Sequence, residues 1–390
     1  MGPVSRAGLA KPGNFGPMTP FLSDAFSPSR PVRSTHAVWW SEWVPDIIHD
    51  AQARGPHRRG INMKSQAAWY RRNGEAREVL ELGEIDVAAP AAGEVCVKLA
   101  TSGVNPSDVK SRRARPVDAA LIVPHSDGAG VISAVGAGVS ASRLGERVWI
   151  WNGQWQRPLG TASQYMVLPS EQAVVLPHHI DFAAAACLGI PALTAQQAVN
   201  LAGDLRGATV LVIGAGAAVG HYVTQMVKQA GGRVIGTVGN EARAGHARAA
   251  GADEVVFYKT ESVVERVKSL TQGRGVDAII DMDFSTTAAL LPQGVLRPHG
   301  VLVCYGSNVN TEVPVTFRPL LWGSFDLRFF LVYDLTPADR VRTVAQIGEA
   351  LKNNTLQHAV AQRFPLSDIV AAHEAVESGQ AVGNIVIDLP

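Results

Sequence analysis

One stretch near the middle of the chain, TVLVIGAGAAVGHYVTQMVKQAGG at residues 209–232, constrains the fold more than any other. An apolar, β-branched run ends at Gly214, a turn of small residues follows, and a helix is expected from about Val219. A pyrophosphate must approach the backbone closely, so the turn needs small residues, and the first turn of the helix favours its negative charge. The stretch therefore predicts a dinucleotide-binding strand–turn–helix unit.

The residues that follow repeat the same rhythm of strand and helix. We expect strands at 209–213, 233–238, 254–258, 277–281, 300–305 and 326–333, and helices near 219–229, 241–250, 262–270 and 337–352. Nearly continuous apolar strands separated by helices indicate a parallel sheet that is covered on both faces. The α/β fold class therefore includes a doubly wound Rossmann domain, which we place at residues 188–335.

The chain before this domain has a different pattern. Short strands such as 94–100, 130–135 and 147–151 are bounded by Gly, Pro and Asn, which indicates a β-rich domain. A last strand is expected at 384–389. We assign residues 63–187 to this second domain.

Residues 1–62 are rich in Pro, Gly, Ser and Arg and show no sustained period, apart from one possible helix at 38–53. Three interpretations compete: a start assigned too far upstream, so that the segment is not native, a disordered tail, or an organelle-targeting peptide. The first two are favoured, because transit peptides are poor in acids. This segment contains four acids, Asp24, Glu42, Asp46 and Asp50.

Charge and cysteine usage narrow the function class. The net charge is +1, so we expect neither nucleic acid nor a membrane surface as a partner. Cys96, Cys187 and Cys304 are far apart, which argues against disulfides and a structural zinc site. No apolar run reaches the roughly 18–20 residues that span a bilayer. A soluble, cytoplasmic protein is expected.

The second predicted strand of the Rossmann domain bears on the choice of cofactor. Enzymes that use NAD place an acid at its end to hold the ribose 2′-hydroxyl. Here the strand ends at Gly239 without an acid, and Glu241 is better explained by the start of a helix. Arg243 and Tyr258 offer a basic and a hydroxyl group that suit a 2′-phosphate, so NADPH is preferred. The alternative is that Arg243 is a solvated helix residue.

Several motifs together resemble one family. They are GVNPSD at 103–108, the turn at 127–130, GIPALTA at 189–195, the long glycine loop Gly214-x-Gly216-x-x-x-Gly220, and GNIVIDL at 383–389. They resemble the zinc-independent quinone oxidoreductases, the zeta-crystallin-like branch of the medium-chain dehydrogenases/reductases. The resemblance covers residues 63–390. It implies a GroES-like catalytic domain at 63–187 and 336–390, with the Rossmann domain inserted into it.

The same resemblance implies a catalytic site without a metal. Asn105 and Ser126 stand where zinc alcohol dehydrogenases carry metal ligands, and His125 is displaced by one residue, so we expect it to be a turn or surface residue. We expect hydride transfer to an activated quinone or enone, with the Asn105 amide as donor to the developing oxyanion. Asn105 has a plainer alternative role, which is to cap the turn before Pro106. Asp108 is expected to orient neighbouring groups.

Further residues are assigned by the resemblance. Thr194 is expected near the nicotinamide amide, or else as a helix cap. Arg243 and Tyr258 match positions that contact the 2′-phosphate. The remaining cofactor contacts are expected at Gly214, Gly216, Ala217, Ala218, Val219, Gly220, Gly239, Tyr305, Gly306, Ser307 and Asn384.

Two features depart from the family or leave alternatives open. Many relatives carry a Tyr after the GxNPxD element, but residues 110–122 contain none, and the charges Lys110, Arg112, Arg113 and Arg115 there suggest a solvated loop or an anion-steering patch. Trp149 and Trp151 form either an apolar wall for a flat acceptor or ordinary core.

The resulting prediction is an NADPH-dependent oxidoreductase that acts on quinones or activated enones. An enoyl-type reductase of α,β-unsaturated acyl or carbonyl substrates is the alternative enzyme. A non-catalytic NADPH-binding protein, crystallin-like or regulatory, is the alternative from another class. The apolar run FFLVY at 329–333 suits a strand edge that pairs with a second copy, so a homodimer is expected.

Overall fold

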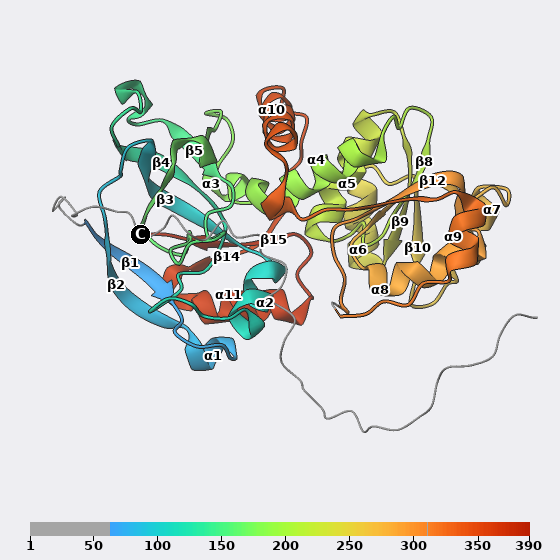
Figure 1. The fold of residues 1–390 in the computed structure, drawn as a ribbon, viewed down its shortest axis with the longest axis horizontal. Coiled ribbons are helices and arrows are strands. Elements are labelled where there is room, and N and C mark those ends of the chain that lie inside the picture. The colour runs from blue at the N-terminus through green and yellow to red at the C-terminus, as the bar shows by residue number, and fades with distance from the viewer. Residues whose placement is uncertain (1–62, 310) are drawn as a thin grey trace, which may run out of the picture. The chain divides into compact units, whose positions relative to one another are not determined.

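Two large β-sheets organise the chain (Figure 1). The computed structural model describes residues 63–309 and 311–390. The extension predicted at 1–62, with its possible helix at 38–53, lies outside the described residues. Among the residues described, no helix has both the length and the apolar character that crossing a membrane requires.

The first large sheet has six parallel strands in the order β10-β9-β8-β11-β12-β13. This order runs outward in both directions from β8, as in a doubly wound Rossmann sheet. The bounds are β8 (Thr209–Val212), β9 (Arg233–Val238), β10 (Glu254–Phe257), β11 (Val276–Asp281), β12 (Leu296–Cys304) and β13 (Asp326–Phe329). The expected doubly wound parallel sheet is confirmed, and the domain bounds 188–335 stay a prediction.

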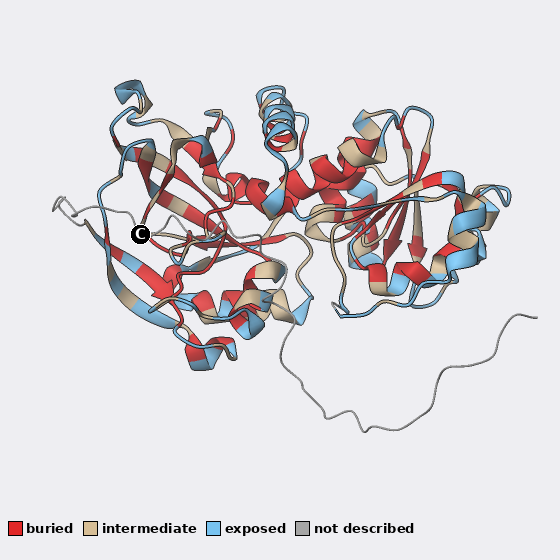
Figure 2. Ribbon diagram, in the orientation of Figure 1, coloured by how far each residue is buried: buried red, intermediate tan, exposed pale blue. Residues whose placement is uncertain are grey.

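Helices cover both faces of this sheet, because alternate strand residues point to opposite sides. Val210 and Val212 pack in one core with α4, α5, α6 and α10, whereas Leu211 packs in a second core with α7 and α8. Figure 2 shows the central strands buried between these layers. The helices are α4 (Leu193–Ala202), α5 (Ala218–Gln229), α6 (Glu241–Ala249), α7 (Val263–Leu270), α8 (Phe284–Thr287), α9 (Phe317–Gly323) and α10 (Pro337–Lys352).

The second large sheet combines strands from the first part of the described chain with two strands near its C-terminal end. Its order is β14-β15-β3-β4-β5-β7, with β6 paired to β3, and all pairs except β14–β15 are antiparallel. The bounds are β3 (Glu94–Val104), β4 (Asp127–Val135), β5 (Arg147–Ile150), β6 (Tyr165–Pro169), β7 (Ala173–Val175), β14 (Val360–Pro365) and β15 (Asn384–Asp388). The predicted combination of a β-rich unit with a Rossmann unit is therefore correct.

Smaller elements surround the second sheet. β1 (Met63–Trp69) and β2 (Glu81–Val87) form a separate antiparallel pair. The helices are α1 (Ala76–Val79), α2 (Pro106–Ala114), α3 (Phe182–Ala185) and α11 (Ile369–Ser378). A π-helical turn, Leu188–Ala192, leads directly into α4 and contains Pro191.

Two local expectations were wrong. The strand expected at 326–333 ends at Phe329, and a 3-10 turn, Val332–Asp334, follows it. The charged loop expected at 110–115 is largely the helix α2, and Arg112 on it is fully buried. Its guanidinium donates to the Gly74 carbonyl at 2.6 Å and pairs with Glu377 of α11. Arg112 is thus a structural residue that ties α2 to α11.

We expect Glu377→Ala to destabilise the fold by about 3 kcal/mol, because it leaves the buried Arg112 charge without its partner. Glu374→Ala is the matched control, since Glu374 lies on the same helix and pairs with the exposed Arg77. The control substitution should lower the free energy of unfolding by less than about 1 kcal/mol. Urea unfolding measures both values, and equal losses would contradict this role of Arg112.

Candidate active site

A glycine-rich turn at the carboxyl end of β8 forms a tight cradle. Gly214 has φ of 73°, which favours glycine. A Cβ on Gly220 would lie 2.2 Å from the Gly214 carbonyl oxygen, so a side chain there is excluded. The Gly214 N–H donates to Thr237 Oγ1 of β9 at 2.9 Å, which anchors the turn. The cradle ends at the N-terminus of α5, whose first residues are Ala218 and Val219 after the cap residue Ala217.

This geometry fits the pyrophosphate of a dinucleotide. The backbone is accessible there because the turn carries only small side chains, and residues 213–219 are partly exposed apart from Ala215 and Gly216. The amino end of α5 adds unpaired N–H groups and a favourable dipole. The turn therefore has the small side chains and the adjoining helix N-terminus on which the prediction of a pyrophosphate site was based.

The end of β9 meets the end of β10 beside this cradle. A Cβ on Gly239 would lie 2.9 Å from the Tyr258 hydroxyl, so that hydroxyl lies directly over the strand end. Asn240, which comes next, caps α6 by accepting the Arg243 N–H at 3.0 Å. Glu241 lies in the first turn of α6, as expected, and pairs with Arg248.

Arg243 is not a freely solvated helix residue. Its guanidinium donates to the carbonyls of Gly216 at 2.8 Å, Gly379 at 2.6 Å and Ala381 at 3.0 Å. These bonds connect the cradle to the turn that precedes β15. Since a guanidinium has five N–H donors, two of them are left for a ligand.

The ends of β11 and β12 complete this side of the sheet. Met282, which follows β11, lies so close to the cradle that a Cβ on Gly214 would contact its sulfur. A Cβ on Gly306 would lie 2.7 Å from the Met282 carbonyl oxygen. Met282 was not among the predicted cofactor residues, although its place just after a buried parallel strand is the signal that would have found it.

The other predicted cofactor residues have these surroundings. Tyr305 is half-buried and its ring contacts Phe330. Ser307 donates to the Val309 carbonyl at 2.5 Å. The Asn384 backbone and amide both donate to the Ala359 carbonyl, at 2.8 and 3.0 Å.

A second group of polar residues surrounds the start of α2. Asn105 precedes the helix, and its backbone N–H donates to Asp108 Oδ2 at 2.7 Å, while its amide donates to Asp127 Oδ2 at 2.9 Å. Burial raises the pKa of Asp108 to about 7 and raises the pKa of Asp127 well above its ordinary value. Asp108 thus orients Asn105, as the sequence predicted, and Asn105 has one amide N–H left.

Tyr333 joins this group from the segment after β13. Its hydroxyl donates to Ser107 Oγ at 2.9 Å, and its ring stacks on Trp155 with centroids 4.9 Å apart. Tyr333 was expected in a strand and was not among the predicted site residues. No local signal distinguishes it, because it is 226 residues from Ser107.

Trp149 and Trp151, expected either as an apolar wall or as ordinary core, lie in two different environments. Trp149 is fully buried in the core, so it cannot line a site. Trp151 is half-buried, with the Arg340 guanidinium 4.3 Å from its ring centroid. Thr194 is buried in the first turn of α4, where Ala192 is the cap residue, so the alternative role of Thr194 as a cap was wrong.

His125 was expected in a turn or on the surface, but it is fully buried. It bonds Ser102 Oγ at 2.9 Å through Nδ1 and His373 at 2.9 Å through Nε2, and the two rings stack. His125 is therefore an interior residue, and the expectation of a turn or surface position was wrong. Within 63–309 and 311–390 there is no cluster of three or more His, Cys, Asp or Glu that could hold a metal.

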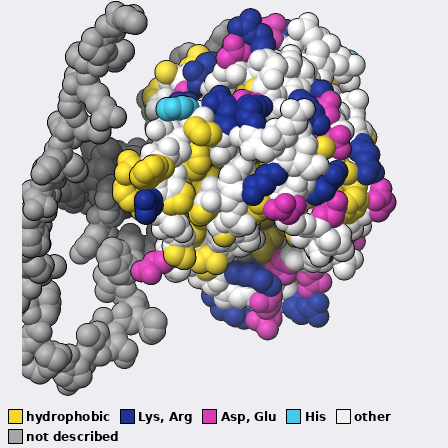
Figure 3. Space-filling view, turned by 90° about the vertical axis from the view of Figure 1, so that its right-hand side faces the viewer, with side chains coloured by type: hydrophobic (Ala, Val, Ile, Leu, Met, Phe, Trp, Pro, Cys, Tyr) yellow, Lys and Arg dark blue, Asp and Glu magenta, His cyan; other side chains and the backbone are white. Residues whose placement is uncertain are grey.

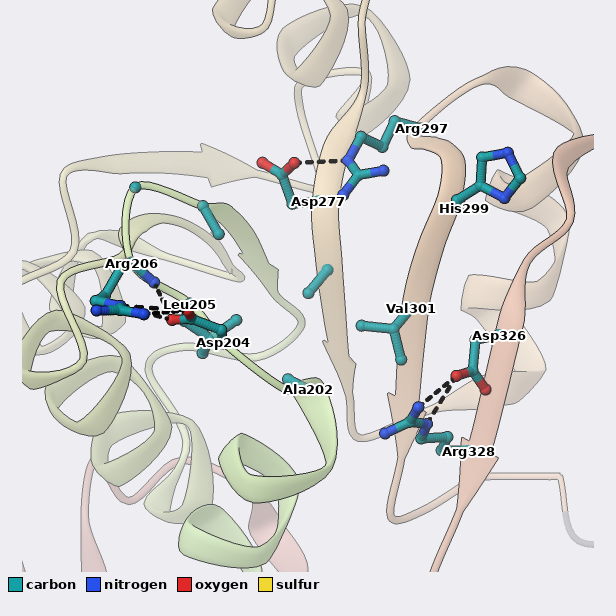
Figure 4. Close-up of a pocket in the computed structure, with 13 residues that line it drawn as sticks. Ala202, Asp204, Leu205, Arg206, Asp277, Arg297, His299, Val301, Asp326 and Arg328 are labelled. Carbon is teal, nitrogen blue, oxygen red and sulfur yellow. Dashed lines mark hydrogen bonds and ion pairs between the residues drawn. The ribbon is translucent and has the colours of Figure 1, made fainter.

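A pocket of about 400 Å³ lies at the opposite end of the parallel sheet (Figure 4). Its three arginines are each paired with an aspartate: Arg206 with Asp204, Arg297 with Asp277, and Arg328 with Asp326. Ligands of doubly wound sheets bind at the carboxyl ends of the strands. We therefore place the active site at the glycine cradle and the start of α2, away from this pocket.

Comparisons with known proteins agree with this geometry. The alcohol dehydrogenase GroES-like domain matches residues 91–178, and the zinc-binding dehydrogenase domain matches residues 250–387. A quinone oxidoreductase of Pseudomonas aeruginosa is 31% identical over 318 residues, which are 80% of this chain and 95% of that protein. The chain belongs to the quinone oxidoreductase family of medium-chain dehydrogenases/reductases.

Other members and structures support the same family. A 2-haloacrylate reductase of a Burkholderia species is 29% identical, over 78% of this chain and 93% of that protein. A mycobacterial protein whose structure was solved with NADPH is 28% identical in sequence and has a TM-score of 0.72. The match covers 83% of this chain and 99% of that protein. The structure of an NAD-dependent alcohol dehydrogenase is 27% identical in sequence and has a TM-score of 0.74. The match covers 83% of this chain and 100% of that protein. As a quinone oxidoreductase-like enzyme, the chain is an oxidoreductase that uses a nicotinamide cofactor.

The buried histidine pair predicts how stability depends on pH. Burial lowers the pKa of His125 to about 3 and lowers that of His373 well below its ordinary value. The unfolded chain takes up protons below about pH 6.5 while the folded pair does not, so the pair makes stability fall as pH falls. From about pH 7 to about pH 5 the loss is about 2 kcal/mol for each imidazole.

The variant His125→Asn with His373→Gln isolates this effect from the buried acids Asp108 and Asp127, whose raised pKa values act in the opposite direction. We expect the variant to lose less stability than the wild type when urea unfolding is repeated at the lower pH. Equal losses of stability in the variant and the wild type would show that the buried pair His125–His373 does not resist protonation.

Proposed function

We propose that this enzyme uses NADPH to reduce quinones or activated enones without a metal. The observation that carries the proposal is the donor set around the start of α2. It offers an amide from Asn105 and a hydroxyl from Ser107, whereas zinc prefers thiolate and imidazole ligands. Such a set suits an acceptor that is already activated and needs only hydrogen bonds to its oxygen.

The preference for NADPH is supported by the end of β9. Gly239 and Asn240 stand where NAD enzymes carry an acid, while the Tyr258 hydroxyl and the Arg243 guanidinium lie close by. The two free N–H donors of Arg243 and the exposed Tyr258 suit a 2′-phosphate. The cradle at 214–220 holds the pyrophosphate, and the segment 305–307 lies at the strand end where the dinucleotide crosses the sheet.

We expect Arg243→Glu to raise the KM for NADPH by roughly 10- to 100-fold, the loss expected for a charge-assisted hydrogen bond. The KM for NADH should change far less, which separates a phosphate contact from a general loss of structure through the broken carbonyl bonds. Arg248→Glu, on the same helix, is the control. Steady-state kinetics with both cofactors measure the effect, and an equal rise for NADPH and NADH would remove Arg243 from the phosphate site.

A bound reduced nicotinamide supplies a hydride, and the protein supplies the surroundings. We assign the hydroxyl of Thr194 to the nicotinamide amide and the free amide N–H of Asn105 to the acceptor oxygen. Asp127 accepts the other N–H at 2.9 Å, and Asp108 fixes the backbone, so the amide is held before the acceptor binds. Such preorganised donors stabilise a developing oxyanion more than mobile ones do.

An enoyl-type reductase remains the second candidate, because the Burkholderia relative reduces 2-haloacrylate, as its name states. Both activities need hydride addition and an oxyanion donor, and they differ in the acceptor. NADPH oxidation with a panel of quinones, enones and unsaturated acids distinguishes them after dialysis against a chelator. Turnover that disappears with the chelator, or that is absent with every acceptor, would contradict the proposal.

We also propose that two copies of the chain pair through the edge strand β13. Phe329 at its end is 57% exposed and Leu331 just beyond it is 49% exposed, although both are apolar. Trp322 on α9, which precedes β13, is 74% exposed. Figure 3 shows apolar side chains gathered on this end of the molecule. An unpaired edge with apolar neighbours suits an isologous contact.

Light scattering is expected to give a mass twice the 41.3 kDa of one chain. Phe329→Asp with Leu331→Asp should shift the mass to that of one chain, because charges at the edge oppose strand pairing. Val341→Asp on α10 is the control, since this residue is 71% exposed and lies on another element. A wild-type monomer that does not change with concentration would contradict the pairing.

A further inference from the structure

We propose that Tyr333 is a catalytic residue whose hydroxyl donates a hydrogen bond to the acceptor oxygen, opposite the Asn105 amide. This inference rests on the proposed function and adds the second donor to it. Residues 110–122, where many family members carry a Tyr, contain none. The structure supplies a phenol to the same group of residues from a different part of the chain.

Three contacts hold Tyr333 in place. Its hydroxyl donates to Ser107 Oγ at 2.9 Å, and Ser107 lies two residues after Asn105. Its ring stacks on Trp155 at 4.9 Å, with an interplanar angle of 20°. Its backbone carbonyl accepts the Asn152 amide at 2.7 Å. Because ring, hydroxyl and backbone are all fixed, the phenol is oriented before the acceptor binds.

The hydroxyl is available for a ligand because its partner can change roles. Tyr333, Ser107 and Trp155 are all partly exposed, unlike Asn105, which is 5% exposed. A serine hydroxyl both donates and accepts. When an acceptor binds, Ser107 can donate to Tyr333, and the Tyr333 O–H is then directed to the acceptor oxygen.

The neighbouring carboxyl groups do not compete for this role. Asp108 and Asp127 are buried and each holds Asn105, one through the backbone N–H and one through the amide. Of the six tyrosines in the chain, Tyr258 follows β10 with its hydroxyl over the end of β9, and Tyr222 bonds His358 at 2.8 Å. Tyr333 is the tyrosine that bonds the GVNPSD segment.

The reaction balances with one hydride from the nicotinamide and one proton from water. The hydride forms a bond to the acceptor carbon, or to the acceptor oxygen of a quinone, and brings two electrons. In an enone the displaced electron pair moves onto the carbonyl oxygen, and in a quinone it moves onto the oxygen that does not receive the hydride. The Tyr333 and Asn105 hydrogen bonds stabilise the negative charge on that oxygen. A proton from water then neutralises the charge, on the oxygen of a quinone or on the α-carbon of an enone. Burial raises the pKa of Tyr333, so its hydroxyl stays protonated as a donor throughout the neutral range.

Tyr333→Phe tests the proposal, because it keeps the ring that stacks on Trp155 and removes only the hydroxyl. We expect kcat to fall by roughly 100-fold, as for the loss of one oxyanion donor, with the KM for NADPH unchanged. The fall should be the same across the neutral pH range, because the donor does not titrate there. Tyr165→Phe, on β6, is the matched control and should keep the wild-type kcat.

A second measurement does not depend on turnover. The anaerobic binding of a hydroquinone product to the protein without nicotinamide, followed by calorimetry, should weaken several-fold in Tyr333→Phe and remain unchanged in Tyr165→Phe. A Tyr333→Phe enzyme with both kcat and hydroquinone affinity within about twofold of the wild type would overturn the role of Tyr333 alone. A wild type that reduces no acceptor would overturn the proposed function, and this role with it.

Discussion

The close contact between Gly220 and the Gly214 carbonyl is the constraint on which the nucleotide side of the site depends. A Cβ on Gly220 would lie 2.2 Å from that oxygen, so α5 can approach β8 only with glycine there. This approach brings the amino end of α5 to the carboxyl edge of the parallel sheet. The ends of β9, β11 and β12 meet at the same edge, because parallel strands all end on one side. Met282 and Gly306 touch there, and Arg243 connects the cradle to the turn before β15.

The acceptor side of the site depends on a different constraint, which is that buried polar groups form hydrogen bonds with one another. Asn105 is held by two carboxyl groups, and the same short segment presents Ser107 to Tyr333. Tyr333 follows β13 of the Rossmann sheet, whereas Asn105 belongs to the loop between β3 and α2. The proposed oxyanion donors therefore come from both sheets, and their spacing depends on how the segment after β13 packs near α4.

Most of the fold could be predicted from the sequence, because the patterns involved are local. The strands β8, β9 and β11 are runs of buried apolar residues, and the cradle is a contiguous motif. The parts that could not be predicted depend on contacts between distant residues. Arg112 and His125 looked like surface residues, but Glu377 and His373, which are 265 and 248 residues away, make their burial possible. Tyr333 was missed for the same reason, whereas Met282 directly follows the buried strand β11 and had a local signal. The roles of Asn105, Thr194, Arg243, Tyr258 and Asn384 stay predictions.

The central claim is direct hydride transfer from the nicotinamide to an activated acceptor, aided only by hydrogen bonds. The most direct test is a single turnover with NADPH that carries deuterium at the transferred position of C4, with an enone as the acceptor and a chelator present. We predict that the deuterium appears on carbon in the reduced product and that the rate of transfer shows a primary isotope effect. Deuterium released to water instead, or a reaction that stops with the chelator, would contradict the account.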